Sequence, residues 1–257
     1  MDQVFERGHR MLISSWKGLE FDGFCVKEDS GVVYTLSGAP DLYFNAILDM
    51  PPKHLISPPI LKTLKIIVNS YQQDKKGCVC WVKDKDYEGY QTFLEQENFQ
   101  KLGHIETLAL DLKDLNFERS SKAPLKIKNS QDFPPWFSVF QEAFELSKTG
   151  SSLFSTLLEN SIPKDTFIHY YLLFQDKITS ILSVMMLEND DIGLFNFGTF
   201  KAQRNKGHLS ELVVLCLMEA RKRGKQTAIV HANQASQSLL KKLGFKKVGS
   251  YGFYGRI

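Results

Sequence analysis

A short basic segment with a glycine lies directly in front of a long apolar stretch in the C-terminal part of the chain. Residues 204–209 read Arg-Asn-Lys-Gly-His-Leu, and a strand-like stretch precedes them. The first backbone N–H groups of a helix, together with its dipole, form an anion site suited to a pyrophosphate. Gly207 lets the backbone approach such a ligand closely, and Arg204 and Lys206 add positive charge. The spacing therefore predicts a strand, loop and helix that hold a phosphorylated ligand.

Composition narrows the class of protein. The chain has 257 residues, enough for one large domain or two small ones, and its 43% hydrophobic residues are ordinary for a globular protein. A net charge of +3, spread along the chain, does not indicate a nucleic-acid partner. The apolar runs are shorter than the roughly 20 residues that span a bilayer, and the N-terminus lacks the apolar region of a secretory signal. We expect a cytoplasmic protein without a membrane partner.

The cysteines do not indicate a metal site. Cys78 and Cys80 lie two residues apart on a predicted strand, so they share one face of it. Neither Cys25 nor Cys216 completes a zinc-ligand spacing. We predict reduced, buried thiols and no bound metal.

Periodicity and turn residues predict the elements of the C-terminal half. Strands are expected at residues 126–128, 169–175, 179–188, 192–199, 227–232 and 247–256, and helices at 132–146, 209–223 and 235–243. Gly224 and Gly244 are placed to end the last two helices. Residues 148–163 show no readable pattern and are expected to form an acceptor loop. This order predicts a mixed β-sheet wrapped by helices, an α/β (α+β) fold.

The N-terminal half contains an echo of this pattern. Gln91, Phe93 and Phe99 have the same spacing as Gln237, Leu239 and Phe245. In the same way, the pair Phe44-Asn45 matches the pair Phe195-Asn196. The segment after Asn45 is rich in proline and has no glycine, so it cannot form a phosphate-binding loop. We therefore predict two related halves, with domains 1–118 and 124–257 and a linker at 116–124.

From about Leu125 to the end, the chain resembles the GNAT (GCN5-related N-acetyltransferase) superfamily. Residues 204–209 are similar to its pattern Gln/Arg-x-x-Gly-x-Gly/Ala. Asn233 and the following helix, which ends in Leu243-Gly244-Phe245, resemble the Asn-x-x-Ala-x-x-x-Tyr-x-x-x-Gly-Phe ending of the family. The N-terminal half looks like the degenerate first part of bacterial two-part GNAT proteins. The resemblance implies tandem GNAT-like mixed sheets flanked by helices, and acetyl-CoA as the co-substrate.

The resemblance also implies which residues bind the donor. The pantetheine arm is expected on the backbone of the last residues of the strand, and the pyrophosphate on the loop and helix start. The residues carried over for this role are Phe197, Gly198, Thr199, Arg204, Asn205, Lys206, Gly207, His208, Leu209, Ser210 and Asn233.

The chain departs from the family at two positions. Leu209 replaces a small residue close to the phosphates, which would displace the helix start or the ligand. Leu240 stands where many members have the tyrosine that protonates the leaving thiolate, and leucine has no proton to donate.

The family reaction is the direct attack of an amine on the thioester, so it needs a proton acceptor and a polar group for the carbonyl oxygen. Glu188 and His231 are the candidate proton acceptors. Tyr254, or Tyr251, is a candidate substitute acid. Each of these residues also has an ordinary structural interpretation, as a turn, strand or packing residue.

We therefore expect an acyl-CoA-dependent N-acyltransferase, with acetyl-CoA as donor, acting on a primary amine of a small molecule or a protein. The alternative hypothesis is a CoA-binding or structural pseudoenzyme without transfer activity, which the two leucines would explain. The sequence does not determine the oligomeric state.

Overall fold

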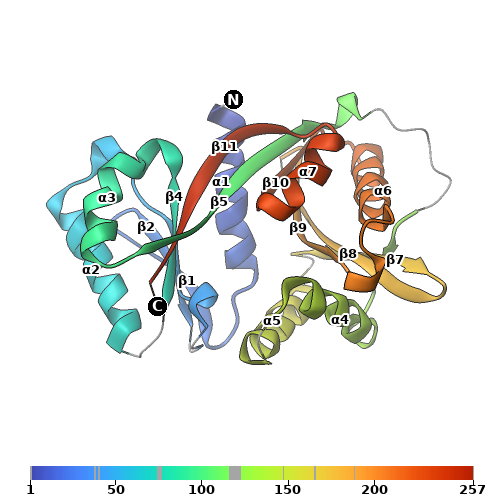
Figure 1. The fold of residues 1–257 in the computed structure, drawn as a ribbon, viewed down its shortest axis with the longest axis horizontal. Coiled ribbons are helices and arrows are strands. Elements are labelled where there is room, and N and C mark those ends of the chain that lie inside the picture. Colours follow the sequence, from blue (N-terminus) through green and yellow to red (C-terminus); the bar gives the residue numbers. More distant parts are fainter. Residues whose placement is uncertain are drawn as a thin grey trace. The chain divides into compact units, whose positions relative to one another are not determined.

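A computed structural model describes residues 2–37, 39, 41–73, 77–115, 123–146, 148–164, 166–187 and 189–256. Unit 1 consists of Met1–Met11 with Thr107–Val248, and unit 2 of Leu12–Glu106 with Gly249–Ile257. Helix α1 (Asp2–Gly18) and strands β5 (Gln100–Asp111) and β11 (Lys246–Arg256) therefore have residues in both units (Figure 1). The linker predicted at 116–124 lies largely outside the described residues, and the domain boundaries at 118 and 124 remain a prediction.

Unit 1 is built on a mixed sheet with the strand order β5-β10-β9-β8-β7-β6. Strands β9 and β10 are parallel, and β8 pairs antiparallel with both β7 and β9. The strand bounds are β6 Leu125–Lys126, β7 Ile168–Phe174, β8 Lys177–Met186, β9 Asp191–Thr199 and β10 Thr227–Ala232. The predicted mixed α/β fold is confirmed.

Helices cover both faces of this sheet. Because side chains alternate along a strand, Leu182 and Val184 of β8 join the core under α6 (His208–Lys222), while Ser183 points to the other face. Helix α7 (Gln234–Lys242) adds Leu240 to that same core. Helix α4 (Phe133–Phe144) covers the Ser183 side, and α5 (Lys148–Ser161) packs against α4 (Figure 1).

The first residues of α1 also lie on the α4 side of unit 1. Gly8 makes the close approach possible, because an added Cβ there would lie 3.0 Å from side-chain carbons of Ile229 and Thr107. Three residues further along α1, Met11 is buried in a cluster with Ile229.

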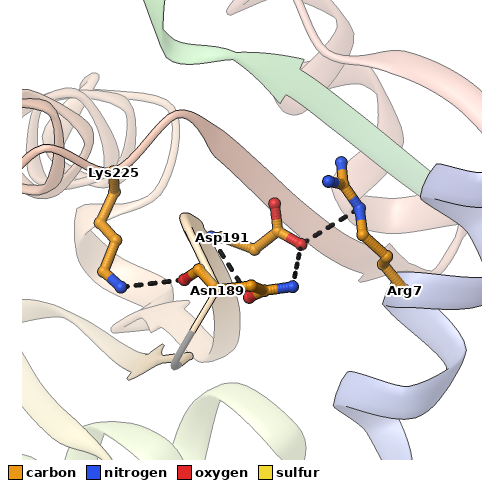
Figure 2. Close-up of polar contacts among 4 residues, drawn as sticks. All are labelled: Arg7, Asn189, Asp191 and Lys225. Atoms are coloured by element: carbon orange, nitrogen blue, oxygen red, sulfur yellow. Dashed lines mark hydrogen bonds and ion pairs between the residues drawn. The ribbon is translucent and has the colours of Figure 1, made fainter.

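An ion pair holds this helix at the turn between β8 and β9 (Figure 2). Arg7 Nε lies 3.2 Å from Asp191 Oδ2, and the Asp191 side chain is only 1% exposed. Asn189 Nδ2 donates to the same oxygen at 2.9 Å, and Lys225 Nζ donates to the carbonyl oxygen of Asn189 at 3.0 Å. The buried carboxylate thus has a charged partner and an amide donor, as burial of a charge requires.

Unit 2 has the strand order β1-β2-β3-β4-β11-β5. Its other elements are β1 Phe24–Asp29, β2 Val32–Ser37, β3 Ala46–Asp49, β4 Cys78–Lys83, α2 Pro58–Gln73 and α3 Tyr87–Gln96. Cys78 and Cys80 both lie in the core under α2 and α3, as their spacing predicts. Burial raises the pKa of the Cys78 thiol to about 12, so this thiol is protonated at neutral pH.

Several helices were not predicted. The expected loop at residues 148–163 is wrong, because α5 forms there, and neither α1 nor α2 was anticipated. Among the described residues, no helix combines the length and the apolar character needed to cross a membrane.

Candidate donor-binding site

Strands β9 and β10 lie side by side only over their first residues. Their parallel register begins with Thr227 opposite Asp191 and ends with Val230 opposite Leu194. Beyond this point β9 continues to pair with β8, up to Thr199 opposite Ser180. Within the described strands, residues 195–199 therefore have no strand partner on their β10 side. An open strand edge of this kind offers backbone hydrogen bonds to a ligand.

A β-bulge lies where the two strands separate. Ser183 pairs with Phe195 and Ile181 pairs with Gly198, so one residue of β8 faces two residues of β9. Asn196 is one of these two residues of β9, and its φ of +48° lies in the left-handed region that asparagine tolerates. The bulge therefore contains Phe197, the first predicted donor-binding residue, and redirects the strand at this point.

Gly198 is required by packing. A Cβ at this position would lie 2.6 Å from Cβ of Ala143, near the end of α4. The absence of a side chain therefore lets α4 lie directly against the open part of β9. Next to it, Thr199 Oγ1 forms a 2.8 Å hydrogen bond with Ser180 Oγ, which ties the strand end to β8.

The loop after β9 leads into α6 through two left-handed residues. Asn205 has φ +63° and Gly207 has φ +84°. Gly207 is the N-cap of α6 and provides no side-chain cap, so the first N–H groups of the helix, at His208, Leu209 and Ser210, keep the orphan character of a helix start. A Cβ at Gly207 would meet nothing within 4 Å, so the left-handed φ, and not packing, favours glycine here.

The basic side chains of the loop are exposed and make weak contacts within the protein. Arg204 Nε donates to the Thr199 carbonyl oxygen at 3.4 Å, and its Nη2 reaches the Ala143 carbonyl oxygen at 3.5 Å. Lys206 Nζ donates to Gln203 Oε1 at 3.0 Å. The Arg204 contacts join the loop to β9 and α4, and the Lys206 contact lies within the loop.

The leucine that departs from the family pattern does not fill the loop. Leu209 packs against the core cluster under α6. Its neighbour His208 lies against Phe174, with ring centroids 5.0 Å apart. The Nε2 atom of His208 is buried without a hydrogen-bond partner among the described residues.

Asn233 has a structural role in the described residues. Its side-chain oxygen accepts a hydrogen bond from the Ser236 N–H at 3.2 Å and caps α7. Its predicted contact with the donor remains a prediction.

The geometry argues against His231 as a base. Its Nε2 donates to the Gly8 carbonyl oxygen at 3.0 Å, and its Nδ1 lies 3.1 Å from Thr107 Oγ1. Burial lowers the pKa of His231 to about 4. The ring is therefore neutral at pH 7, and both nitrogens are engaged in joining α1 to β10 and β5.

The other predicted acid and base candidates lie in unit 2 or outside the described residues. Glu188 lies outside the described residues. Tyr254 belongs to unit 2, where its ring stacks on Tyr87 with centroids 5.8 Å apart and burial raises its pKa to about 12. Leu240 is fully buried in the core of unit 1. These roles remain predictions.

A groove of about 580 Å³ lies on unit 1 between the first half of α4 and the β7–β8 hairpin, and it reaches the residue that follows β9. Leu173, Ile178 and Phe200 give it apolar walls. None of the predicted donor-binding residues lines it. Among the described residues, no group of three or more His, Cys, Asp or Glu side chains is arranged to hold a metal ion.

Sequence reasoning missed the residues that shape the opening of β9. Asn196 was read as an ordinary strand residue, and its side chain binds Ser183 on the neighbouring strand. An asparagine inside an apolar strand is a detectable signal for a bulge, since asparagine disfavours strands and tolerates positive φ.

Comparison with known proteins shows likeness in structure and not in sequence. No protein-family model matches the chain, and no curated protein matches its sequence. A GCN5-related N-acetyltransferase from Kribbella flavida superposes with a TM-score of 0.70 at 12% identity, covering 96% of this chain and 95% of that one.

Further solved structures agree with this likeness. A tandem GNAT protein from the clavulanic acid biosynthesis pathway has a TM-score of 0.65 at 13% identity, covering 95% of this chain and 87% of its own. A conserved protein of unknown function from Staphylococcus epidermidis has a TM-score of 0.63 at 13% identity, with 94% and 96% covered.

Proposed function

We propose that this chain, which has the fold of the GCN5-related N-acetyltransferases, transfers an acyl group, acetyl in the first instance, from coenzyme A to a primary amine. The observation that carries the proposal is one continuous segment, residues 195–210. It joins an open strand edge, through a loop with two basic residues, to a helix start that has no side-chain cap. A pantetheine arm carries amides that pair with a strand edge, and a pyrophosphate suits a helix N-terminus.

The residues present fit such a donor. The acyl-CoA would supply an activated acyl group as its thioester. The backbone of Phe197, Gly198 and Thr199 would hold the arm, and an N–H group there would polarise the carbonyl oxygen of the acyl group. Gly207 has no side chain at the start of α6 and would let the phosphates approach the helix closely, and Arg204 would add positive charge beside them.

Proton transfer has no side chain assigned to it among the described residues of unit 1. His231 is neutral and engaged through both nitrogens, and Leu240 has no proton to give. Because a thiolate is a good leaving group, orientation of the two substrates supplies much of the rate enhancement. We infer that water carries the protons in and out of the site.

The same observations favour an alternative, a protein that binds acyl-CoA without transferring the group. A direct test separates the two functions. Thermal unfolding is recorded with and without acetyl-CoA, and acetyl transfer is then assayed against a panel of small amines and lysine peptides.

Donor at 100 times its dissociation constant stabilises the native state by about 2.7 kcal/mol. Stabilisation with transfer to any amine supports the transferase, and stabilisation without transfer supports the alternative. No stabilisation at millimolar acetyl-CoA contradicts both.

A further inference from the structure

A buried chain of hydrogen bonds leads from α5 to the bulge of β9. Asn196 Nδ2 lies 3.3 Å from Ser183 Oγ, and Ser183 Oγ lies 2.8 Å from His169 Nδ1. His169 Nε2 lies 3.1 Å from Ser161 Oγ and 3.3 Å from the Leu158 carbonyl oxygen. The chain thus connects the end of α5, β7, β8 and β9 at the place where β9 leaves β10.

The partners determine the direction of every proton in this chain. A carbonyl oxygen can only accept, so the His169 nitrogen that faces Leu158 carries the hydrogen, and the other nitrogen of a neutral ring is an acceptor. The Ser183 hydroxyl must then donate to His169. Its oxygen is left to accept from the Asn196 amide. All the hydrogen bonds are satisfied only in this one arrangement.

The surroundings hold the chain in place. Ser161 and Ser183 are fully buried, and His169 is 2% exposed. The imidazole packs against Trp136 with ring centroids 4.7 Å apart. Burial lowers the pKa of His169 to about 4, so the ring stays neutral at physiological pH.

We propose that Ser183 and His169 are positioning residues for the acyl donor: through Asn196 they hold the bulge of β9 in the form that presents the backbone of Phe197 to the pantetheine arm. This inference rests on the proposed function. Neither side chain touches the donor, since both are buried behind the strand. They act by removing the freedom of an asparagine that is held at positive φ and would otherwise relax.

The position of the chain along β9 predicts a selective effect. The bulge comprises Asn196 and Phe197, whereas the anion-binding loop begins after Thr199. Loss of the hydrogen bond between Ser183 and Asn196 should therefore weaken binding of the pantetheine arm and leave binding of the nucleotide part unchanged. A residue that served folding alone would affect both parts or neither.

The experiment measures the affinity of the whole chain for two ligands by titration calorimetry. Acetyl-CoA probes the arm and the loop together, and ADP 3′-phosphate, the nucleotide part of the donor, probes the loop alone. Ser183→Ala removes the hydroxyl that binds the Asn196 side chain. The matched control is Thr179→Val, which also removes a buried hydroxyl of β8, but one that donates to the Leu172 carbonyl oxygen of β7. Asn196→Gly is the second variant, because glycine tolerates the backbone angle and lacks the amide.

We expect Ser183→Ala and Asn196→Gly to bind acetyl-CoA about tenfold more weakly, the effect of one lost hydrogen bond. Both should bind ADP 3′-phosphate as the wild type does, and Thr179→Val should keep both affinities. Unchanged affinity for acetyl-CoA in Ser183→Ala and Asn196→Gly, or equal losses for the two ligands, would overturn the inference. Equal affinity of the wild type for acetyl-CoA and ADP 3′-phosphate would also overturn the inference, because the pantetheine arm would then add nothing to binding. Binding of neither ligand by the wild type would overturn the proposed function itself.

Discussion

Gly207 and Gly224 lie at opposite ends of α6 with nearly the same backbone angle, φ +84° and +83°. A Cβ added to either would meet nothing within 4 Å. The two positions therefore impose the same conformational demand and have the same free space. They differ in the end of the helix dipole that they face: Gly207 lies at the N-terminus of α6, after the loop that follows β9, and Gly224 lies after its C-terminus.

We expect Gly207→Glu to abolish stabilisation by acetyl-CoA, because it places a carboxylate where the pyrophosphate would lie. Gly224→Glu should keep the full shift of about 2.7 kcal/mol at 100 times the dissociation constant. Both variants should lose roughly 1–2 kcal/mol of stability, the cost of a side chain in the left-handed region. Thermal unfolding with and without ligand measures both effects. Equal ligand shifts in the two variants would contradict the assignment of the loop.

The contact between Gly198 and α4 can be tested by a double-mutant cycle. Gly198→Ala would place its Cβ 2.6 Å from that of Ala143, and such overpacking costs about 1–3 kcal/mol. Ala143→Gly removes the obstacle, at a cost of about 1 kcal/mol for glycine in a helix. We expect the double variant to be more stable in urea than the sum of the single effects predicts. Additive effects would mean that α4 moves freely away from the strand.

The loop and its flanking elements were predictable because local residues determine them. Gly207 and Gly224 mark both ends of α6, and the expected helix at 209–223 differs by one residue from His208–Lys222. The strand expected at 192–199 is Asp191–Thr199. Glycines in the left-handed conformation and apolar periodicity act over a few residues, so sequence reading captures them.

Helix α5 was not predictable for the opposite reason. Its first turns contain Gly150, Ser151 and Ser152, which have low helix propensity. The helix is stabilised by burial of Leu157 and Leu158. A helix that depends on tertiary packing in this way shows only a weak apolar periodicity in its sequence.

The hydrogen-bonded residues that hold the bulge were not predictable, because they are far apart in sequence. Asn196, Ser183 and His169 come from three neighbouring strands, and they meet only once the register of the sheet is known. No spacing along the chain signals such a set. The docking of Gly8 against His231 spans an even longer separation.

The buried His231 makes the stability of the protein sensitive to acid. Its pKa is about 4 in the folded state and about 6.5 in the unfolded chain, so the unfolded state binds the proton first as the pH falls. The favourable contribution is complete above pH 6.5 and is lost between pH 6.5 and 4, on the order of 3 kcal/mol.

We expect His231→Gln to be less stable than the wild type at pH 7.5 and to lose less stability on transfer to pH 5. Urea unfolding at the two pH values measures the difference. His169 contributes in the same direction in both proteins, so it cancels in the comparison. Identical losses in the wild type and the variant would show that His231 does not titrate in this range.

The ion pair between Arg7 and Asp191 tests whether the start of α1 is a part of unit 1. Arg7→Ala would leave a carboxylate that is 1% exposed without its charged partner, and such a loss costs roughly 3 kcal/mol. Adding Asp191→Asn removes the stranded charge, so the double variant should be more stable than Arg7→Ala alone. Lys113→Ala is the control, because its pair with Asp111 is exposed and should be worth less than about 1 kcal/mol.

Chemical unfolding gives these stabilities, and amide hydrogen exchange at Gly8 and Met11 reports on the helix itself. We expect exchange there to accelerate in Arg7→Ala and to remain as in the wild type in Lys113→Ala. The His231 bond to the Gly8 carbonyl oxygen and the burial of Met11 continue to hold the helix, so the acceleration should be partial. A double variant less stable than Arg7→Ala would show that Asp191 is stabilised mainly by its other donors, among them Asn189.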